Sequence, residues 1–81
     1  MTVELLLFGP VAEAFGSQCL ELTGGQSITC RDLQEQLHRL RPDLVGLIDS
    51  CRWAQNQRFV ALESRVTPGD EIALIPPVAG G

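Results

Sequence analysis

Two short apolar runs stand near opposite ends of the sequence, and together they point to a sheet-based fold. Val3 to Phe8 is followed by Gly9-Pro10, and Glu71 to Ile75 is followed by Pro76-Pro77. Runs of this length that end at glycine or proline are typical of buried strands rather than helices. The second run has apolar residues on both faces, which favours a strand covered on both sides. We therefore expect the two runs to lie side by side at the centre of one sheet.

One amphipathic helix is predicted between these runs. Thr29 is a good N-cap, and Asp32 stands where the acidic member of a capping box lies. Apolar side chains then recur at intervals of four and three residues along one helical face, at Leu33, Leu37 and Leu40. Pro42 ends the helix, because proline lacks the backbone N–H that another turn needs.

The remaining segments are shorter. We expect a helical turn at residues 11–15, strands at 19–22, 52–55 and 58–62, a short helix or an apolar loop at 43–50, and a turn at 67–70. Strands on both sides of one main helix indicate an α+β fold, in which a mixed sheet packs on that helix. The ubiquitin-like β-grasp arrangement satisfies this order. We assign residues 1–77 to such a domain and residues 78–81 to a flexible C-terminal Gly-Gly tail.

The size of the chain limits where chemistry can take place. A domain of 81 residues buries only about 60% of the surface that its unfolded chain exposes. The core is therefore thin, and a large internal active site is not expected. We expect the chemistry at an edge, at a terminus or at a partner interface.

Charge and cysteine content argue against several classes of function. The net charge is −4 and all six basic residues are arginines, so a basic patch for nucleic acid is not supported. This mild acidity suits a basic partner surface, or it only keeps the protein soluble. Cys19, Cys30 and Cys51 match neither a zinc ligand set nor a redox pair. We expect free thiols in a reducing cytoplasm, with no metal site.

The N-terminal run is too short to span a membrane and has no signal-peptide pattern, so no membrane association is expected.

The usual catalytic groups are sparse. His38, the sole histidine, is expected on the helix surface or at its boundary. Cys30 stands near a helix start, where the dipole can lower the pKa of a thiol, but burial as a structural residue is the better interpretation of both Cys30 and Cys51.

The C-terminal residues are the remaining candidate site. Pro76-Pro77 favour an extended, stiff backbone that projects the following residues away from the body. Gly80 and Gly81 carry no side chains, so their backbone can enter a narrow channel and bring the Gly81 carboxylate to a reacting centre. The alternative is a frayed tail without a role.

A resemblance to a known family gives this site a chemistry. Residues 68–81, PGDEIALIPPVAGG, closely resemble the C-terminus of molybdopterin synthase small subunits, the sulfur carriers of the MoaD type in the ubiquitin-like MoaD/ThiS superfamily. Residues 7–13, LFGPVAE, are similar to that family's first strand and following turn, and the segment after Asn56 also fits. The resemblance extends over essentially the whole chain.

The resemblance implies a sulfur carrier of molybdenum cofactor biosynthesis. An adenylyltransferase of the ubiquitin-activating type would use ATP to adenylate the Gly81 carboxylate, and a sulfur donor would then replace AMP, leaving a thiocarboxylate. The tail would enter the large subunit of molybdopterin synthase and give its sulfur to the pterin precursor. A heterotetramer of small and large subunits, no permanently bound cofactor and no enzymatic activity of the carrier alone are also implied.

The resemblance also implies the residues that contact the partners. They are apolar residues of the sheet face and residues of the tail, namely Phe8, Phe59, Ile75, Pro76, Pro77, Val78 and Ala79, with Gly80 threading the tail. The alternative for Phe8, Phe59 and Ile75 is packing in the core. Asp70 and Glu71 are candidates for pairing with partner cations, although the turn at 67–70 already accounts for Asp70.

Three other functions are open at this point. Carriers for thiamin synthesis, for other sulfur pathways and for protein modification share the fold and the Gly-Gly end, although the PPVxGG ending favours the molybdopterin branch. A β-grasp interaction module with a passive tail is the second. A small enzyme with Cys30 or Cys51 as nucleophile is the third, and no partnered base supports it.

Overall fold

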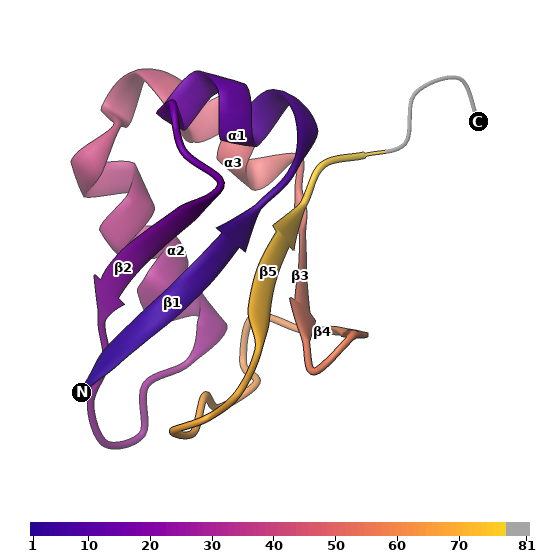
Figure 1. Cartoon of the computed structure of the whole chain (residues 1–81). Helices are drawn as coiled ribbons and strands as arrows, with labels where there is room; N and C mark the ends of the chain where they lie inside the picture. Colours follow the sequence, from indigo (N-terminus) through magenta and orange to yellow (C-terminus); the bar gives the residue numbers. More distant parts are fainter. Residues whose placement is uncertain (78–81) are drawn as a thin grey trace.

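The two apolar runs form adjacent strands at the centre of one sheet, as predicted. In this computed structural model, which describes residues 1–77, β1 and β5 pair in parallel, with Leu5 opposite Ile72 and Leu7 opposite Leu74. The elements in chain order are β1 (Thr2–Leu7), α1 (Gly9–Phe15), β2 (Cys19–Thr23), α2 (Cys30–Leu40), the 3₁₀ turn η1 (Pro42–Leu44), α3 (Val45–Asp49), β3 (Arg52–Gln55), β4 (Arg58–Val60) and β5 (Ile72–Ile75) (Figure 1).

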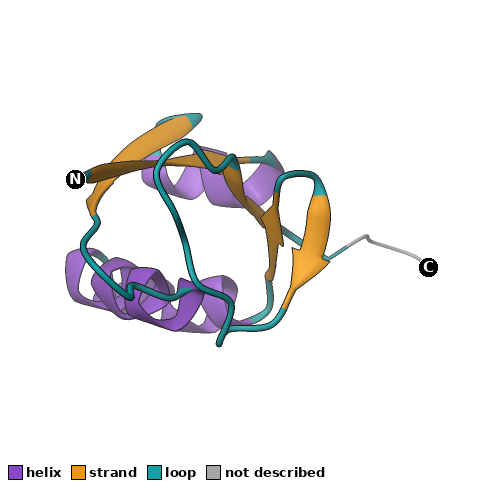
Figure 2. Ribbon diagram, turned by 90° about the horizontal axis from the view of Figure 1, so that it is seen from below, coloured by secondary structure: helices purple, strands orange, loops and turns teal. Residues whose placement is uncertain are grey.

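The sheet is mixed and has the strand order β2-β1-β5-β3-β4. The β1–β5 pair is parallel, whereas β1–β2, β3–β5 and β3–β4 are antiparallel. Helix α2 lies behind the sheet in Figure 1, and Figure 2 shows strands and α2 as separate layers. The expected α+β layer pair with one main helix is therefore confirmed.

The core lies between this helix layer and the inner face of the sheet. Side chains of alternate residues on β1 and β5 meet the leucines of α2 there, because successive residues of a strand point to opposite faces. The largest fully buried side chains are those of Leu5, Leu7, Val11, Cys30, Leu33, Leu37, Ile48, Ile72 and Leu74. Trp53 is also buried, and its indole Nε1–H donates to Gln34 Oε1 at 2.9 Å. A thin but continuous core thus joins sheet and helices.

Helix α2 begins as its sequence predicts. The Thr29 hydroxyl accepts from the Asp32 backbone N–H at 3.3 Å, and the Asp32 carboxylate accepts from the Thr29 N–H at 2.9 Å. These two bonds form a capping box, which satisfies backbone donors that have no partner inside the helix.

The end of α2 differs from the prediction. Leu40 is 58% exposed and does not continue the buried face of Leu33 and Leu37. Arg41 follows as the C-cap of α2, and its backbone has left the helical conformation. Its guanidinium donates to the Ala14 carbonyl at 3.0 Å and lies 5.8 Å from the centroid of the Phe15 ring.

Several strand and helix boundaries also differ by one to two residues, and those of β1 and β4 bear on the site. β1 covers residues 2–7 rather than 3–8, which leaves Phe8 outside the strand as the N-cap of α1. β4 ends at Val60 rather than at residue 62, since a turn follows. The segment 43–50 is helical, and so one of the two alternatives for it is confirmed.

Candidate functional site: an apolar hollow at the root of the C-terminal segment

The outer face of the sheet, opposite α2, carries a row of apolar side chains. In register across the strands, Leu6 of β1 pairs with Ala73 of β5, Ala73 with Ala54 of β3, and Ala54 with Phe59 of β4. Paired residues point to the same face of a sheet. Two small alanines therefore form the middle of the row, and larger side chains stand on either side.

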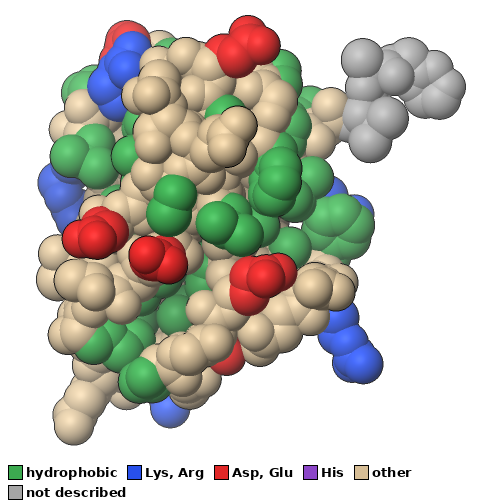
Figure 3. All heavy atoms as spheres, viewed as in Figure 1, with side chains coloured by type: hydrophobic (Ala, Val, Ile, Leu, Met, Phe, Trp, Pro, Cys, Tyr) green, Lys and Arg blue, Asp and Glu red, His purple; other side chains and the backbone are tan. Residues whose placement is uncertain are grey.

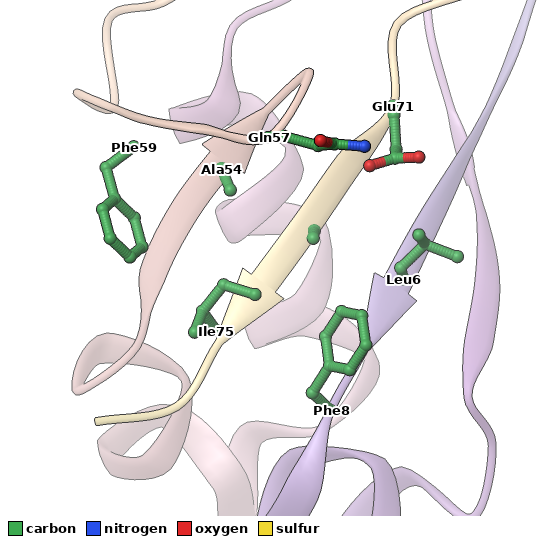
Figure 4. Close-up of a pocket in the computed structure, with 8 residues that line it drawn as sticks. Leu6, Phe8, Ala54, Gln57, Phe59, Glu71 and Ile75 are labelled. Atoms are coloured by element: carbon green, nitrogen blue, oxygen red, sulfur yellow. The ribbon is translucent and has the colours of Figure 1, made fainter. Parts of the chain in front are cut away.

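This arrangement leaves a shallow hollow of about 290 Å³. Its floor is Ala54 and Ala73, and its walls are Leu6, Phe8, Phe59 and Ile75, with Gln57 and Glu71 at the rim. Figure 4 shows Phe8 and Phe59 on opposite sides of the hollow, and Figure 3 shows apolar side chains gathered on this face. The hollow offers binding surface rather than catalysis, because Glu71 is its only ionisable lining residue.

The structure brings together the three predicted partner residues of the sheet face. Phe8 is 47% exposed and Phe59 is 54% exposed, so neither packs in the core. Ile75 is half-buried at the end of β5. An exposed apolar patch rimmed by polar residues marks an interaction surface. Core packing, the alternative for Phe8 and Phe59, is therefore wrong.

The C-terminal segment leaves the sheet beside this hollow. Pro76 follows Ile75 directly, and it lies against the β1–α1 corner: a Cβ on Gly9 would stand 3.4 Å from Pro76 Cγ. Gly9 also has a φ of 55°, in the region that favours glycine. Pro76 is half-buried and Pro77 exposed. The predicted site residues Val78, Ala79, Gly80 and Gly81 lie outside the described residues.

Asp70 has a structural role. Its carboxylate accepts from the Thr67 backbone N–H at 2.7 Å, from Gln55 Nε2 at 2.7 Å and from Asn56 Nδ2 at 3.0 Å. These bonds hold its pKa well below the usual range, the Thr67 backbone donor contributing most. Because its oxygens are engaged within the chain, Asp70 stabilises the turn before β5. Glu71 is exposed, and its backbone N–H donates to Asn56 Oδ1 at 2.9 Å.

The cysteines and the histidine form no site on the described chain. Burial, with a smaller contribution from the Asp70 charge, raises the pKa of the Cys30 thiol to about 11, and burial also raises the pKa of Cys51. Such thiols are poor nucleophiles at neutral pH, because the thiolate is the reactive form. His38 Nε2 lies 2.7 Å from Asp49 Oδ1 at the helix boundary, where it was predicted.

Two further properties hold for residues 1–77. They contain no group of three or more His, Cys, Asp or Glu side chains placed to hold a metal ion. None of their helices combines the length and apolar character that crossing a membrane requires.

Sequence reasoning missed four residues of the hollow, namely Leu6, Ala54, Ala73 and the rim residue Gln57. The run around Leu6 is apolar at every position, so its outward side chain cannot be told from its inward ones. The alanines become a floor only through the pairing of β3 with β5, which is a property of the register. The available signal was one small residue inside each of two strands, Ala54 after Trp53 and Ala73 between Ile72 and Leu74.

Comparisons with known proteins show which family the chain is similar to. The model of the ThiS family matches residues 5–81. The chain is 33% identical over 82 residues to the molybdopterin synthase sulfur carrier subunit of Homo sapiens, an alignment that covers 98% of this chain and 93% of the relative.

Two solved structures are similar over their full length. SAMP1 from Haloferax volcanii has a TM-score of 0.85 and 29% identity, with 100% of both chains covered. A chain in the complex of subunits 1 and 2 of the molybdopterin-converting factor from Helicobacter pylori 26695 has a TM-score of 0.70 and 26% identity, again with 100% of both chains covered. The ubiquitin-like β-grasp fold and the resemblance inferred from the sequence are thus confirmed, and the chain belongs to the ThiS family.

Proposed function

We propose that this chain is the sulfur carrier of molybdenum cofactor biosynthesis and that its working group is the Gly81 carboxylate. The observation that carries the proposal is the continuity between the apolar hollow and the root of the C-terminal segment, since Ile75 lines the hollow and Pro76 follows it. A partner that covers the hollow is thereby positioned next to the residues that lead to Gly81. The similarity to a molybdopterin synthase sulfur carrier subunit supports the same function.

In the proposed chemistry, other proteins activate the Gly81 carboxylate in two steps. An adenylyltransferase of the ubiquitin-activating type attaches the Gly81 carboxylate to the α-phosphate of ATP and releases pyrophosphate. A sulfur donor then attacks the acyl carbon and AMP leaves, so that a thiocarboxylate replaces the carboxylate. The mixed anhydride is needed because a free carboxylate is a poor acyl donor.

Sulfur transfer is proposed to take place in the large subunit of molybdopterin synthase. The thiocarboxylate sulfur bonds to the pterin precursor, and water then cleaves the bond between the acyl carbon and sulfur, so the sulfur stays on the pterin and the Gly81 carboxylate is regenerated for another cycle. The carrier supplies the reactive terminus, and the large subunit supplies the pocket, so the carrier alone is not an enzyme. The solved complex of subunits 1 and 2 from Helicobacter pylori supports such a partner. We further propose a heterotetramer, a cytoplasmic location and no permanently bound cofactor.

Mass spectrometry of the intact protein tests the chemistry. After incubation with ATP, the adenylyltransferase and a sulfur source, we expect a mass increase of about 16 Da, the difference between sulfur and oxygen, at the C-terminus. A variant that lacks Gly80 and Gly81 keeps residues 1–77 and should show no increase. If the full chain stays at its starting mass while a known carrier is converted under the same conditions, the proposal is wrong.

The hollow provides a test of docking. We expect Phe59→Ala to weaken binding to the large subunit about 10-fold or more, because a central aromatic anchor contributes much of the energy of an interface. Leu40→Ala is a matched control, since Leu40 on α2 is 58% exposed and Phe59 is 54% exposed. Isothermal titration calorimetry measures both affinities. Equal affinities for the two variants would contradict docking on the hollow.

A second candidate is a carrier or modifier in another pathway. The TM-score of 0.85 with SAMP1 from Haloferax volcanii favours it as the alternative. A chain that becomes a thiocarboxylate but gives no sulfur to the pterin precursor in the presence of the large subunit would support this alternative.

A further inference from the structure

Three glutamates lie in one row across the outer face of the sheet. Glu4 of β1 is the cross-strand partner of Glu21 of β2. Glu4 and Glu71 stand one residue before Leu5 and Ile72, the first pair of the β1–β5 ladder, so Glu71 continues the row. All three side chains are exposed. Glu4 and Glu21 lie on adjacent strands about 4.8 Å apart, and Glu71 directly precedes β5. Figure 3 shows acidic side chains crossing this face, and Figure 4 shows Glu71 at the hollow.

This acidic row of Glu4, Glu21 and Glu71 places like charges next to one another. Like charges that face each other across neighbouring strands repel. The ion pairs within residues 1–77 are Arg31–Glu63, His38–Asp49 and Arg41–Asp43, and none of them includes a member of the row. The repulsion is therefore not offset by an ion pair on the described part of the chain.

The acidic row borders the apolar hollow directly. Leu6, which lines the hollow, stands two residues after Glu4 on β1 and therefore on the same face, and Glu71 lines the hollow itself. At the far side of the hollow, the Arg52 guanidinium lies 3.9 Å from the centroid of the Phe59 ring. The face is thus polarised, with negative charge along one border of the hollow and positive charge at the other.

We infer that the acidic row selects and orients the protein that covers the hollow, and that the facing surface of this protein carries a strip of arginine or lysine side chains. The inference rests on the proposed function, in which the occupant is the large subunit of molybdopterin synthase. A cationic strip would relieve the repulsion within the row as it docks. Charge complementarity also raises association rates and disfavours wrong orientations.

Orientation matters because the hollow itself is a weak guide. Its lining is apolar apart from Gln57 and Glu71, so it has few polar groups that could fix the direction of a docking side chain. A negative border and a positive border distinguish one direction of docking from its reverse. The correct direction places the partner over Ile75 and Pro76, from which the C-terminal segment continues.

The experiment compares two double variants that each remove two negative charges. Glu4→Gln with Glu21→Gln neutralises two members of the row, whereas Glu13→Gln with Glu35→Gln neutralises two exposed glutamates on α1 and α2. Stopped-flow association with the large subunit is measured at several salt concentrations. We expect the first variant to associate about 3- to 10-fold more slowly at low salt and the second to change less than about 2-fold. The difference should vanish at about 1 M salt, where charges are screened.

Thermal unfolding of the free protein provides an independent measurement. The variant Glu4→Gln with Glu21→Gln should unfold at the same or a higher temperature than the natural chain, because repulsion is removed. A lower unfolding temperature would contradict the repulsion on which the inference depends.

The outcomes separate this inference from the proposed function. Equal rate changes in both variants, or no change in either, would overturn the role of the acidic row. The carrier function would still stand if the natural chain binds the large subunit and is converted to a thiocarboxylate. Failure of the natural chain to bind the large subunit at any salt concentration would overturn both.

Discussion

At the scale of single residues, the charged side chain of Asp70 stabilises the fold instead of binding a partner. Its carboxylate joins the turn at Thr67 to the side chains of Gln55 and Asn56, which lie at and just beyond the end of β3. It therefore fixes the chain just before β5 enters the sheet. The sequence placed Asp70 in a turn, but it did not reveal the partners from β3, which are distant in the chain.

Asp70→Asn should destabilise the protein in a pH-dependent way. We expect the free energy of unfolding to fall by about 1–3 kcal/mol at pH 7, because bonds to a carboxylate are lost. The pKa of Asp70 is lowered by folding, so its contribution is complete above the unfolded pKa of about 4 and is lost as the pH falls further.

Urea unfolding of both chains between pH 7 and pH 2 measures this difference. The gap between the natural chain and the variant should close as the pH falls below about 4. The exposed Glu35→Gln serves as a control with a small effect. A gap that stays constant down to pH 2 would contradict the account.

The three thiols should differ in reactivity. Cys19 is exposed, whereas Cys30 is buried with its pKa raised to about 11. We expect iodoacetamide at pH 8 to modify Cys19 first and Cys30 only after unfolding, because burial withholds both the thiolate and access to it. Peptide mapping by mass spectrometry identifies the order. Rapid modification of Cys30 in the folded chain would contradict this prediction and would favour the alternative of an enzyme with a cysteine nucleophile.

At the scale of elements, the β3–β4 hairpin contains backbone strain. Asn56 and Gln57 both have positive φ, 51° and 69°. These angles are those of a type I′ turn, which matches the twist of a hairpin and favours Asn followed by Gly. Asn56 suits its position, whereas Gln57 carries a side chain in the left-handed region. That side chain also forms part of the rim of the hollow.

Gln57→Gly should therefore stabilise the hairpin. We expect the free energy of unfolding to rise by about 1 kcal/mol, since glycine accepts the left-handed conformation without a steric penalty. Urea unfolding at pH 7 measures the change. Gly69→Ala is the opposite control, because Gly69 has a φ of 91° and alanine should destabilise the chain there. A decrease in stability on Gln57→Gly would show that the side chain contributes more than the strain costs.

At the scale of the whole molecule, one core cluster joins all the helices and the inner face of the sheet. A small domain with a single core is expected to unfold in one cooperative step. Trp53, the sole tryptophan, reports on that core because it is 3% exposed and bonded to Gln34 of α2. We expect its fluorescence and the far-UV circular dichroism to change at the same urea concentration. Separate midpoints would show that sheet and helices unfold independently.

The sequence predicts those parts of the molecule that depend on local patterns. The central strands follow from two apolar runs, and the start of α2 follows from Thr29 and Asp32. Phe8, Phe59 and Ile75 were placed through a family resemblance, and the structure brings them around one hollow. The parts that could not be predicted depend on distant pairing: the alanine floor, the acidic row and the partners of Asp70. Leu40, the last residue of α2, is exposed although the helical pattern placed it on the buried face.

The position of β5 has a mechanical consequence. This strand carries the C-terminal segment and is hydrogen-bonded to β1 on one side and to β3 on the other. A pull on the C-terminus acts along β5 and loads both ladders in shear, so their bonds must yield together rather than one after another. The folded body can therefore withstand a pull on its C-terminal end without unravelling, and a machine that unfolds the chain from this end must break both ladders of β5 at once.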